Sequence, residues 1–133
     1  VDTWNKMVQS GQTQCATGMG ANQSLLTEYG FKTGGQWEGC GTSDPRVCEQ
    51  QMRKYIDAAS GERVLMVLAF LKKDDKGQCS WGGHYFNIAG FDESGEPLIY
   101  DPYYGSEGAA PQRRSELSYQ CVNYLNFLVV DVK

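Results

Sequence analysis

The stretch HYFNIAGFDESGEPLIYD, from His84 to Asp101, contains two apolar segments separated by a polar turn. Residues 84–91 and 97–101 have the composition of β-strands, and the intervening Asp-Glu-Ser-Gly is typical of a hairpin turn. The stretch therefore predicts two antiparallel strands joined by a tight connection.

The register of this hairpin predicts which side chains share a face of the sheet. Pairing Phe91 with Glu96 across a four-residue turn places Asp101 opposite Phe86. Because side chains alternate along a strand, His84, Phe86 and Asp101 then point the same way, and His84 and Asp101 become diagonal neighbours within hydrogen-bond reach. A turn one residue longer or shorter would move Asp101 to the other face. Alternatively, Asp101 is a turn residue before a proline.

Further strands are predicted on either side of this hairpin. Residues 63–71, RVLMVLAFL, form a continuous apolar run that indicates a central strand covered on both faces. Residues 119–132 contain one more strand, whereas 72–83 and 102–118 are expected to be loops.

Two helices are predicted before the strands. Residues 15–29 can form one helix, and residues 45–59 carry an apolar stripe with Asp44 as N-cap and Pro45 in the first position. Helices followed by a run of antiparallel strands indicate an α+β fold. The length of 133 residues fits a single domain, 1–133.

The charge balance argues against two classes of partner. The chain has 16 acidic and 12 basic residues, a net charge of -4. Nucleic acids and anionic membranes reward clustered Lys and Arg, so neither is an expected partner. No stretch of about 18 apolar residues is present, and no membrane span is predicted. The first residues lack an apolar signal region and an initiator Met, which suggests a mature or excised fragment.

Five cysteines are many for this length, and their number is odd. Two disulfides plus one free thiol are the simplest expectation for a secreted protein, and five reduced thiols in a cytosolic protein are the alternative. Cys40 and Cys48 bracket a short loop, and Cys79 and Cys121 flank the strands. We therefore predict bridges 40–48 and 79–121, with Cys15 left over. Alternatively, Cys48 is a buried free thiol on the helix stripe.

The only histidine, His84, is a candidate catalytic residue. A lone histidine more often has a surface or core role, but this one opens a strand after two glycines and has Asp101 within predicted reach. Cys15 begins the first predicted helix, where the helix dipole favours a thiolate and a neighbouring imidazolium would activate it. A buried or bridged structural Cys15 is the alternative. The cysteine spacings match no common zinc pattern, so no metal is expected.

A family resemblance appears when these residues are taken together. Gln9 stands six residues before Cys15, a predicted helix follows, and a distant His84 opens the segment GGHYFNIAGFDESGEPLIYDPY, which contains Asp101. This arrangement resembles the papain-like cysteine peptidase clan and is most similar to C39-type bacterial peptidases and bacterial effector proteases. The chain departs from the usual family surroundings in the Ala-Thr pair that follows Cys15.

The resemblance implies a papain-like fold, with N-terminal helices packed on an antiparallel sheet, and a catalytic triad. Cys15 would be the nucleophile, His84 the base and Asp101 the residue that orients the histidine. Gln9 would stabilise the oxyanion together with the backbone N–H of Cys15. Two further glutamines, Gln12 and Gln14, compete for the Gln9 role.

The expected function is hydrolysis of an amide bond by a secreted thiol protease, without a cofactor. A protein or peptide is the expected substrate, and a bacterial toxin or effector domain with a cognate inhibitor or immunity protein would fit by analogy. Peptidoglycan amidase or glutamine deamidase activity is an alternative that uses the same triad. A noncatalytic, disulfide-stabilised binding module is the alternative from another class. The aromatic residues Trp81, Tyr103 and Tyr104 either shape a substrate cleft or pack exposed loops.

Overall fold

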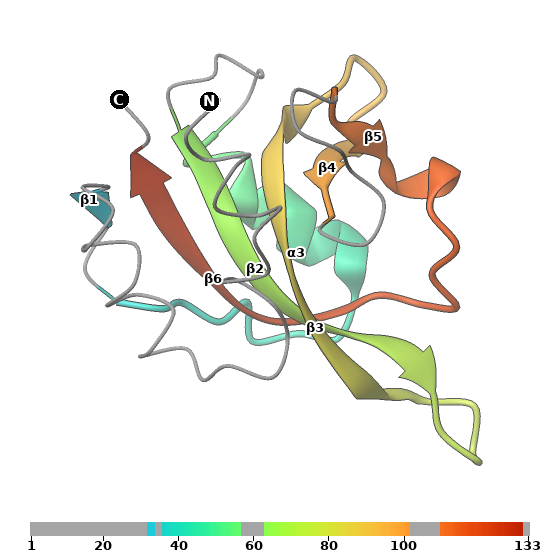
Figure 1. Ribbon diagram of the computed structural model, residues 1–133. Helices are drawn as coiled ribbons and strands as arrows, with labels where there is room; N and C mark the ends of the chain where they lie inside the picture. Colours follow the sequence, from blue (N-terminus) through green and yellow to red (C-terminus); the bar gives the residue numbers. More distant parts are fainter. Residues whose placement is uncertain (1–31, 34–35, 57–62, 102–109, 132–133) are drawn as a thin grey trace.

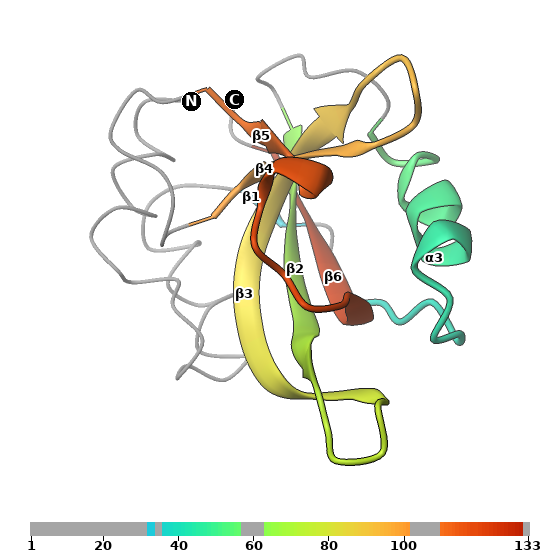
Figure 2. The ribbon, with the colours of Figure 1, turned by 90° about the vertical axis from the view of Figure 1, so that its right-hand side faces the viewer.

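The computed structural model describes residues 32–33, 36–56, 63–101 and 110–131, which form one antiparallel sheet with a short α-helix on one face (Figures 1 and 2). The strand order is β1-β6-β2-β3-β4-β5. The elements are β1 (Lys32–Thr33), α3 (Pro45–Met52), β2 (Arg63–Lys73), β3 (Cys79–Phe91), β4 (Pro97–Tyr100), β5 (Gln112–Arg113), the 3₁₀ turn η1 (Arg114–Glu116) and β6 (Asn123–Asp131).

Strand β2 is central in the sheet, as its apolar sequence predicts. It pairs with β3 on one side and with β6 on the other. Its side chains alternate between two buried clusters. Leu65 and Val67 belong to the cluster that includes α3, and Val64 and Met66 belong to a second cluster on the opposite face. The continuous apolar run is explained by this burial on both faces.

Helix α3 begins as predicted and ends earlier than predicted. The Asp44 side chain accepts a hydrogen bond from the backbone N–H of Arg46 at 3.0 Å, and Pro45 opens the helix. The helix ends at Met52. The predicted end at residue 59 is therefore wrong, because the backbone N–H of Tyr55 bonds to the Met52 carbonyl three residues back, at 3.0 Å, and tightens the last turn.

The described residues are mostly β, with fewer helical residues than the predicted α+β fold implies. The predicted helix at 15–29 lies outside the described residues. The predicted loop 72–83 is wrong at both ends, because β2 continues to Lys73 and β3 begins at Cys79, so the two strands extend as a long hairpin (Figure 1). The helix on an antiparallel sheet is observed, whereas the papain-like topology stays a prediction.

A buried polar group fixes α3 to the sheet. Glu49 is only 5% exposed, and its Oε2 accepts a hydrogen bond from the Tyr124 hydroxyl of β6 at 2.6 Å. The Arg114 Nε lies 3.1 Å from the same oxygen. Burial raises the pKa of Glu49, although the Tyr124 hydrogen bond and Arg114 lower it in part. The pKa of Tyr124 is raised as well, mainly by burial and then by the charge of Glu49.

The raised pKa of Glu49 predicts a pH-dependent stability of definite sign. A carboxyl whose pKa is higher in the folded state stabilises the fold below its unfolded pKa, and this contribution is lost as the pH rises. Replacement of Glu49 by Gln removes the titrating group. We expect the unfolding free energy of the variant, relative to the native chain, to increase from about pH 4 to pH 7. Urea unfolding at several pH values measures this difference.

Glu96 provides the control of opposite sign. Its pKa is lowered, chiefly by the hydrogen bond with Ser115, so its contribution is present above the unfolded pKa and lost as the pH falls. Glu96→Gln should therefore lose stability relative to the native chain over the same rise in pH. Parallel pH profiles for Glu49→Gln and the native chain would contradict the assignment.

Candidate active site

His84 and Asp101 form a buried polar pair. The Nε2 atom of His84 lies 3.0 Å from Oδ1 of Asp101, and the two residues are 5% and 3% exposed. His84 comes from β3, and Asp101 directly follows the last residue of β4. The predicted contact between these two residues is therefore confirmed.

The turn that leads to this contact differs from the prediction. Phe91 pairs with Pro97 and not with Glu96, so the connection contains five residues, 92–96. The backbone N–H of Asp92 bonds to the Glu96 carbonyl at 2.9 Å and closes this turn. On its own, the additional residue would move Asp101 to the face opposite His84.

A β-bulge restores the predicted register. The pairing shifts between Ile88 and Gly90, where β3 has one residue more than β4. Beyond the bulge, Ile88 pairs with Ile99, which is the register predicted from the sequence. The longer turn and the bulge cancel each other, so Asp101 emerges on the same face as His84.

Tyr119 binds the second carboxylate oxygen of Asp101. Its hydroxyl donates a hydrogen bond to Oδ2, while Oδ1 faces His84. The ring of Phe86 lies under both partners, with centroids 6.3 Å from His84 and 5.8 Å from Tyr119. Sequence reasoning missed Tyr119. Its position two residues before Cys121, whose predicted partner is near His84, is the signal that could have found it.

The arrangement assigns different tasks to the two ring nitrogens. In a neutral histidine one nitrogen is a donor and the other an acceptor. A carboxylate oxygen at Nε2 favours a proton on that atom, which leaves Nδ1 as the base. The pair can therefore accept a proton through Nδ1, and the carboxylate would stabilise the imidazolium that results.

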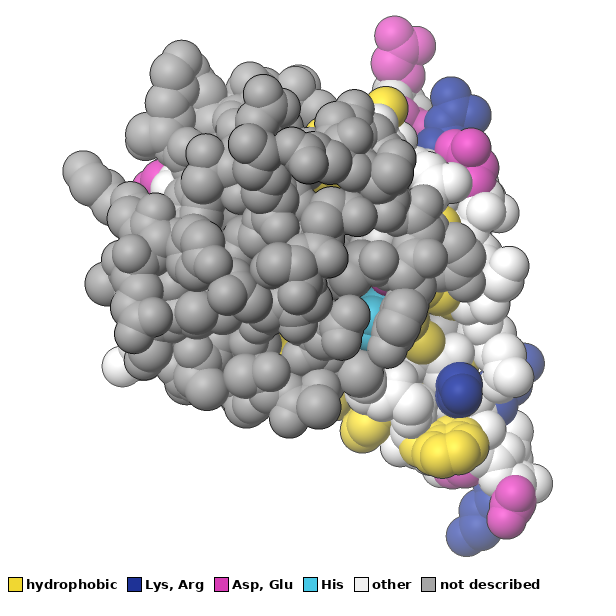
Figure 3. All heavy atoms as spheres, viewed as in Figure 1, with side chains coloured by type: hydrophobic (Ala, Val, Ile, Leu, Met, Phe, Trp, Pro, Cys, Tyr) yellow, Lys and Arg dark blue, Asp and Glu magenta, His cyan; other side chains and the backbone are white. Residues whose placement is uncertain are grey.

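The other predicted site residues have different outcomes. Six of them lie outside the described residues: Gln9, Gln12, Gln14, Cys15, Tyr103 and Tyr104. Trp81 is described and is 58% exposed. Its indole N–H donates to the Lys73 carbonyl at 3.0 Å, and the Lys72 ammonium lies 5.5 Å from its ring centroid. In Figure 3 the single histidine side chain, coloured cyan, is visible on the face that the view presents.

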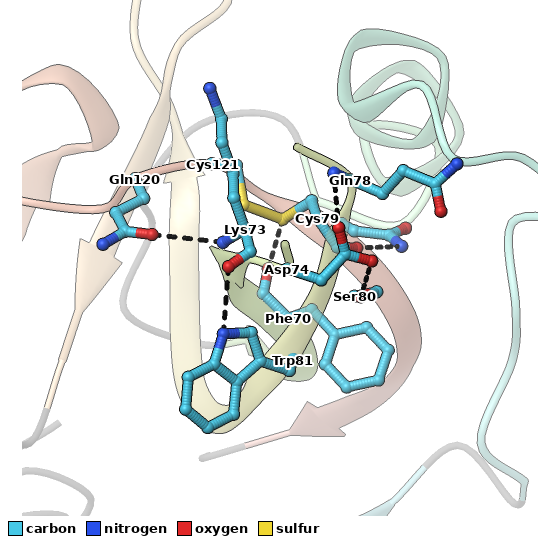
Figure 4. Close-up of a disulfide and its surroundings, with 10 residues drawn as sticks. Phe70, Lys73, Asp74, Gln78, Cys79, Ser80, Trp81, Gln120 and Cys121 are labelled. Atoms are coloured by element: carbon cyan, nitrogen blue, oxygen red, sulfur yellow. Dashed lines mark hydrogen bonds between the residues drawn. A yellow bond between two sulfur atoms is a disulfide. The ribbon is translucent and has the colours of Figure 1, made fainter. Parts of the chain in front are cut away.

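Both predicted disulfides are confirmed. Cys40 is bonded to Cys48, and Cys79 is bonded to Cys121 (Figure 4). The alternative in which Cys48 is a buried free thiol is therefore wrong. The Cys79–Cys121 bridge lies at the start of β3, the strand that carries His84.

The described part of the chain has neither a cluster of metal-ligand side chains nor a membrane-spanning helix. Within it, no three side chains of the types His, Cys, Asp and Glu come together as metal ligands would. No helix in the same ranges is long and apolar enough to cross a membrane.

Comparison with known proteins does not identify the chain. No protein-family model matches it, and no curated protein or solved structure is significantly similar to it.

The position of Asp101 predicts a large effect on stability. Asp101→Ala removes the carboxylate that the buried His84 imidazole and the partly buried Tyr119 hydroxyl both face. We expect the free energy of unfolding to fall by about 1–3 kcal/mol, the cost of removing a charged hydrogen-bond partner from a buried polar group. Urea denaturation measures this loss. Asp75→Ala, on the exposed hairpin turn, is the control and should change stability by less than about 0.5 kcal/mol. Equal effects of the two substitutions would contradict the buried position of Asp101.

Proposed function

We propose that this protein is a cysteine hydrolase in which Cys15 attacks an acyl carbon, His84 is the base and Asp101 orients the histidine. The observation that carries this proposal is the buried His84–Asp101 pair, with Nε2 directed at the carboxylate. Gln9 is assigned to the oxyanion by the sequence resemblance alone.

The burial of this pair supports a catalytic interpretation. Removing an imidazole and a carboxylate from water is costly, and apolar side chains of similar size would fill the same space more cheaply. The polar pair is positioned at the end of β4, and its histidine is the only one in the chain. A base held in one tautomer within a protected site is what nucleophilic catalysis requires.

The disulfides support the choice of nucleophile. Four of the five cysteines are bonded to one another in two bridges. No cysteine of the chain is therefore left as an intramolecular partner for Cys15. An odd thiol beside two disulfides is a candidate for reactive chemistry. Disulfides also fit an oxidising compartment, so a secreted location is part of the proposal.

The proposed reaction has two balanced stages. Transfer of the Cys15 thiol proton to Nδ1 of His84 gives a thiolate, which forms a bond to the acyl carbon of the substrate. The amide C–N bond then breaks, and the leaving amine takes the proton from His84. In the second stage His84 removes a proton from water, the resulting hydroxide attacks the thioester, and the acid product leaves as Cys15 regains its proton. Gln9 and the backbone N–H of Cys15 would stabilise the oxyanion in both stages.

The preferred substrate in this proposal is an extended segment of a protein. The protein would then be a secreted peptidase, toxin or effector. The net charge of -4 favours neutral or basic segments over acidic ones through long-range attraction. Peptidoglycan stem peptides and glutamine side chains are the other acyl substrates that the same residues could serve. A noncatalytic binding module would leave the His84–Asp101 pair with a purely structural role.

Substitutions at the nucleophile and the base test the catalytic proposal. Cys15→Ala and His84→Ala should each reduce kcat by at least about a thousandfold, because the members of such a triad act as a unit. Asp101→Ala should reduce kcat by a smaller factor. Hydrolysis of a casein-type substrate after confirmation of folding by circular dichroism measures the effect, with Asp75→Ala as the active control. Full activity of Cys15→Ala would overturn the proposal.

A parallel incubation identifies the substrate class. The enzyme is mixed separately with an unfolded protein, with purified peptidoglycan and with a glutamine-containing protein. New peptide termini in the first sample are expected. Muropeptide products alone, or ammonia release without chain cleavage, would replace the peptidase assignment and keep the triad. Mass spectrometry separates the three outcomes.

A further inference from the structure

The carboxylate of Asp101 has a hydrogen-bonding contact at each of its two oxygens. The terminal torsion of an aspartate is broad, so a single hydrogen bond to a histidine does not fix the carboxylate. Here Oδ1 faces Nε2 of His84, and Oδ2 accepts from the Tyr119 hydroxyl. Because the two oxygens have different partners, rotation of the carboxylate would break both contacts.

Tyr119 lies in a segment outside the strands, between η1 and β6. Two residues later, Cys121 is bonded to Cys79 at the start of β3. The side-chain oxygen of Gln120 accepts a hydrogen bond from the backbone N–H of Lys73 at 3.1 Å, which adds a contact with β2 (Figure 4). The position of Tyr119 is thus set by attachments next to it in sequence.

The disulfide joins this segment to the strand that carries His84. Cys79 precedes His84 by five residues on β3, and Cys121 follows Tyr119 by two. The side-chain N–H of Asn123 also donates to the Cys79 carbonyl at 3.0 Å. The bridge therefore links the segment that contains Tyr119, the hydrogen-bond donor to Asp101, to β3, the strand that contains His84.

We propose that Tyr119 is a positioning residue for the His84–Asp101 pair and that the Cys79–Cys121 disulfide holds it in place. This inference rests on the proposed function for its catalytic consequence. The tyrosine acts through Asp101 and does not itself exchange a proton with the substrate. The other disulfide joins Cys40, before α3, to Cys48 within α3, and we assign it no role in positioning Tyr119.

The single histidine allows the pair to be observed without an activity assay. In a sample labelled with ¹⁵N-histidine, ring nitrogen shifts report the tautomer of His84 alone. Tyr119→Phe should move these shifts from the Nε2–H form towards an average of both tautomers. Tyr124→Phe is the matched control, because it removes a hydroxyl that binds a different buried carboxylate, Glu49. It should leave the His84 spectrum unchanged. An unchanged spectrum for Tyr119→Phe would overturn the proposal.

Activity of the same variants separates this inference from the proposed function. Tyr119→Phe should lower kcat about tenfold with little change in KM, which corresponds to the loss of about one hydrogen bond. Tyr124→Phe should keep its kcat. If the native protein hydrolyses no acyl substrate, the proposed function fails, and the spectra still decide whether Tyr119 orients the pair.

The role of the Cys79–Cys121 disulfide is tested by paired serine substitutions. A reducing agent is not used, because it would also affect the reactivity of Cys15. Cys79→Ser with Cys121→Ser should alter the His84 spectrum as Tyr119→Phe does. Cys40→Ser with Cys48→Ser should not. A native spectrum in a folded Cys79/Cys121 variant would overturn the role of the bridge. If that variant does not fold, Tyr119→Phe against Tyr124→Phe decides the proposal for the tyrosine, and Cys121→Ala with Cys79→Ala repeats the test of the bridge.

Discussion

The pairing of β2 with a long strand on each side is the constraint on which the described structure depends. The apolar run of β2 has buried side chains on both faces, so β3 and β6 must flank it and the two apolar clusters must cover it. This requirement fixes the position of β3, and with it His84, opposite Ala69. It also places Tyr124 of β6 beneath α3, where its hydroxyl meets Glu49. The three strands β2, β3 and β6 with their two apolar clusters thus form a frame that determines where these polar groups lie.

The two disulfides have different positions relative to this frame. Cys40–Cys48 joins the segment before α3 to the helix itself, a closure of eight residues. Cys79–Cys121 closes 42 residues and joins the start of β3 to the approach to β6. A longer closure restricts the unfolded chain more, so the second bridge is expected to contribute more to stability in the chain-entropy description. It is also the bridge adjacent to the candidate site.

The sequence predicts some parts of this arrangement better than others, for physical reasons. The central strand, the start of α3 at Asp44 and both bridges follow from local composition and spacing. The contact between His84 and Asp101 was also predicted, but from a turn with four residues, whereas the turn has five and a bulge corrects the register. A bulge depends on packing between strands, and no simple amino-acid composition predicts its position. Tyr119 was missed because its contact joins residues 18 apart through a segment with no regular structure.

The bulge has a consequence for how this hairpin can change. One residue of β3 is unpaired between Ile88 and Gly90, and this extra residue offsets the odd number of residues in the connection 92–96. The face on which the side chains of β4 lie therefore depends on the bulge and on the length of the connection together. Insertion or deletion of a single residue in the connection would invert every side chain of β4 unless the bulge were lost or gained at the same time. Length variation here should therefore occur in steps of two, or as compensated pairs of changes. In an engineered or diverged version of the hairpin, the two features have to be inherited together.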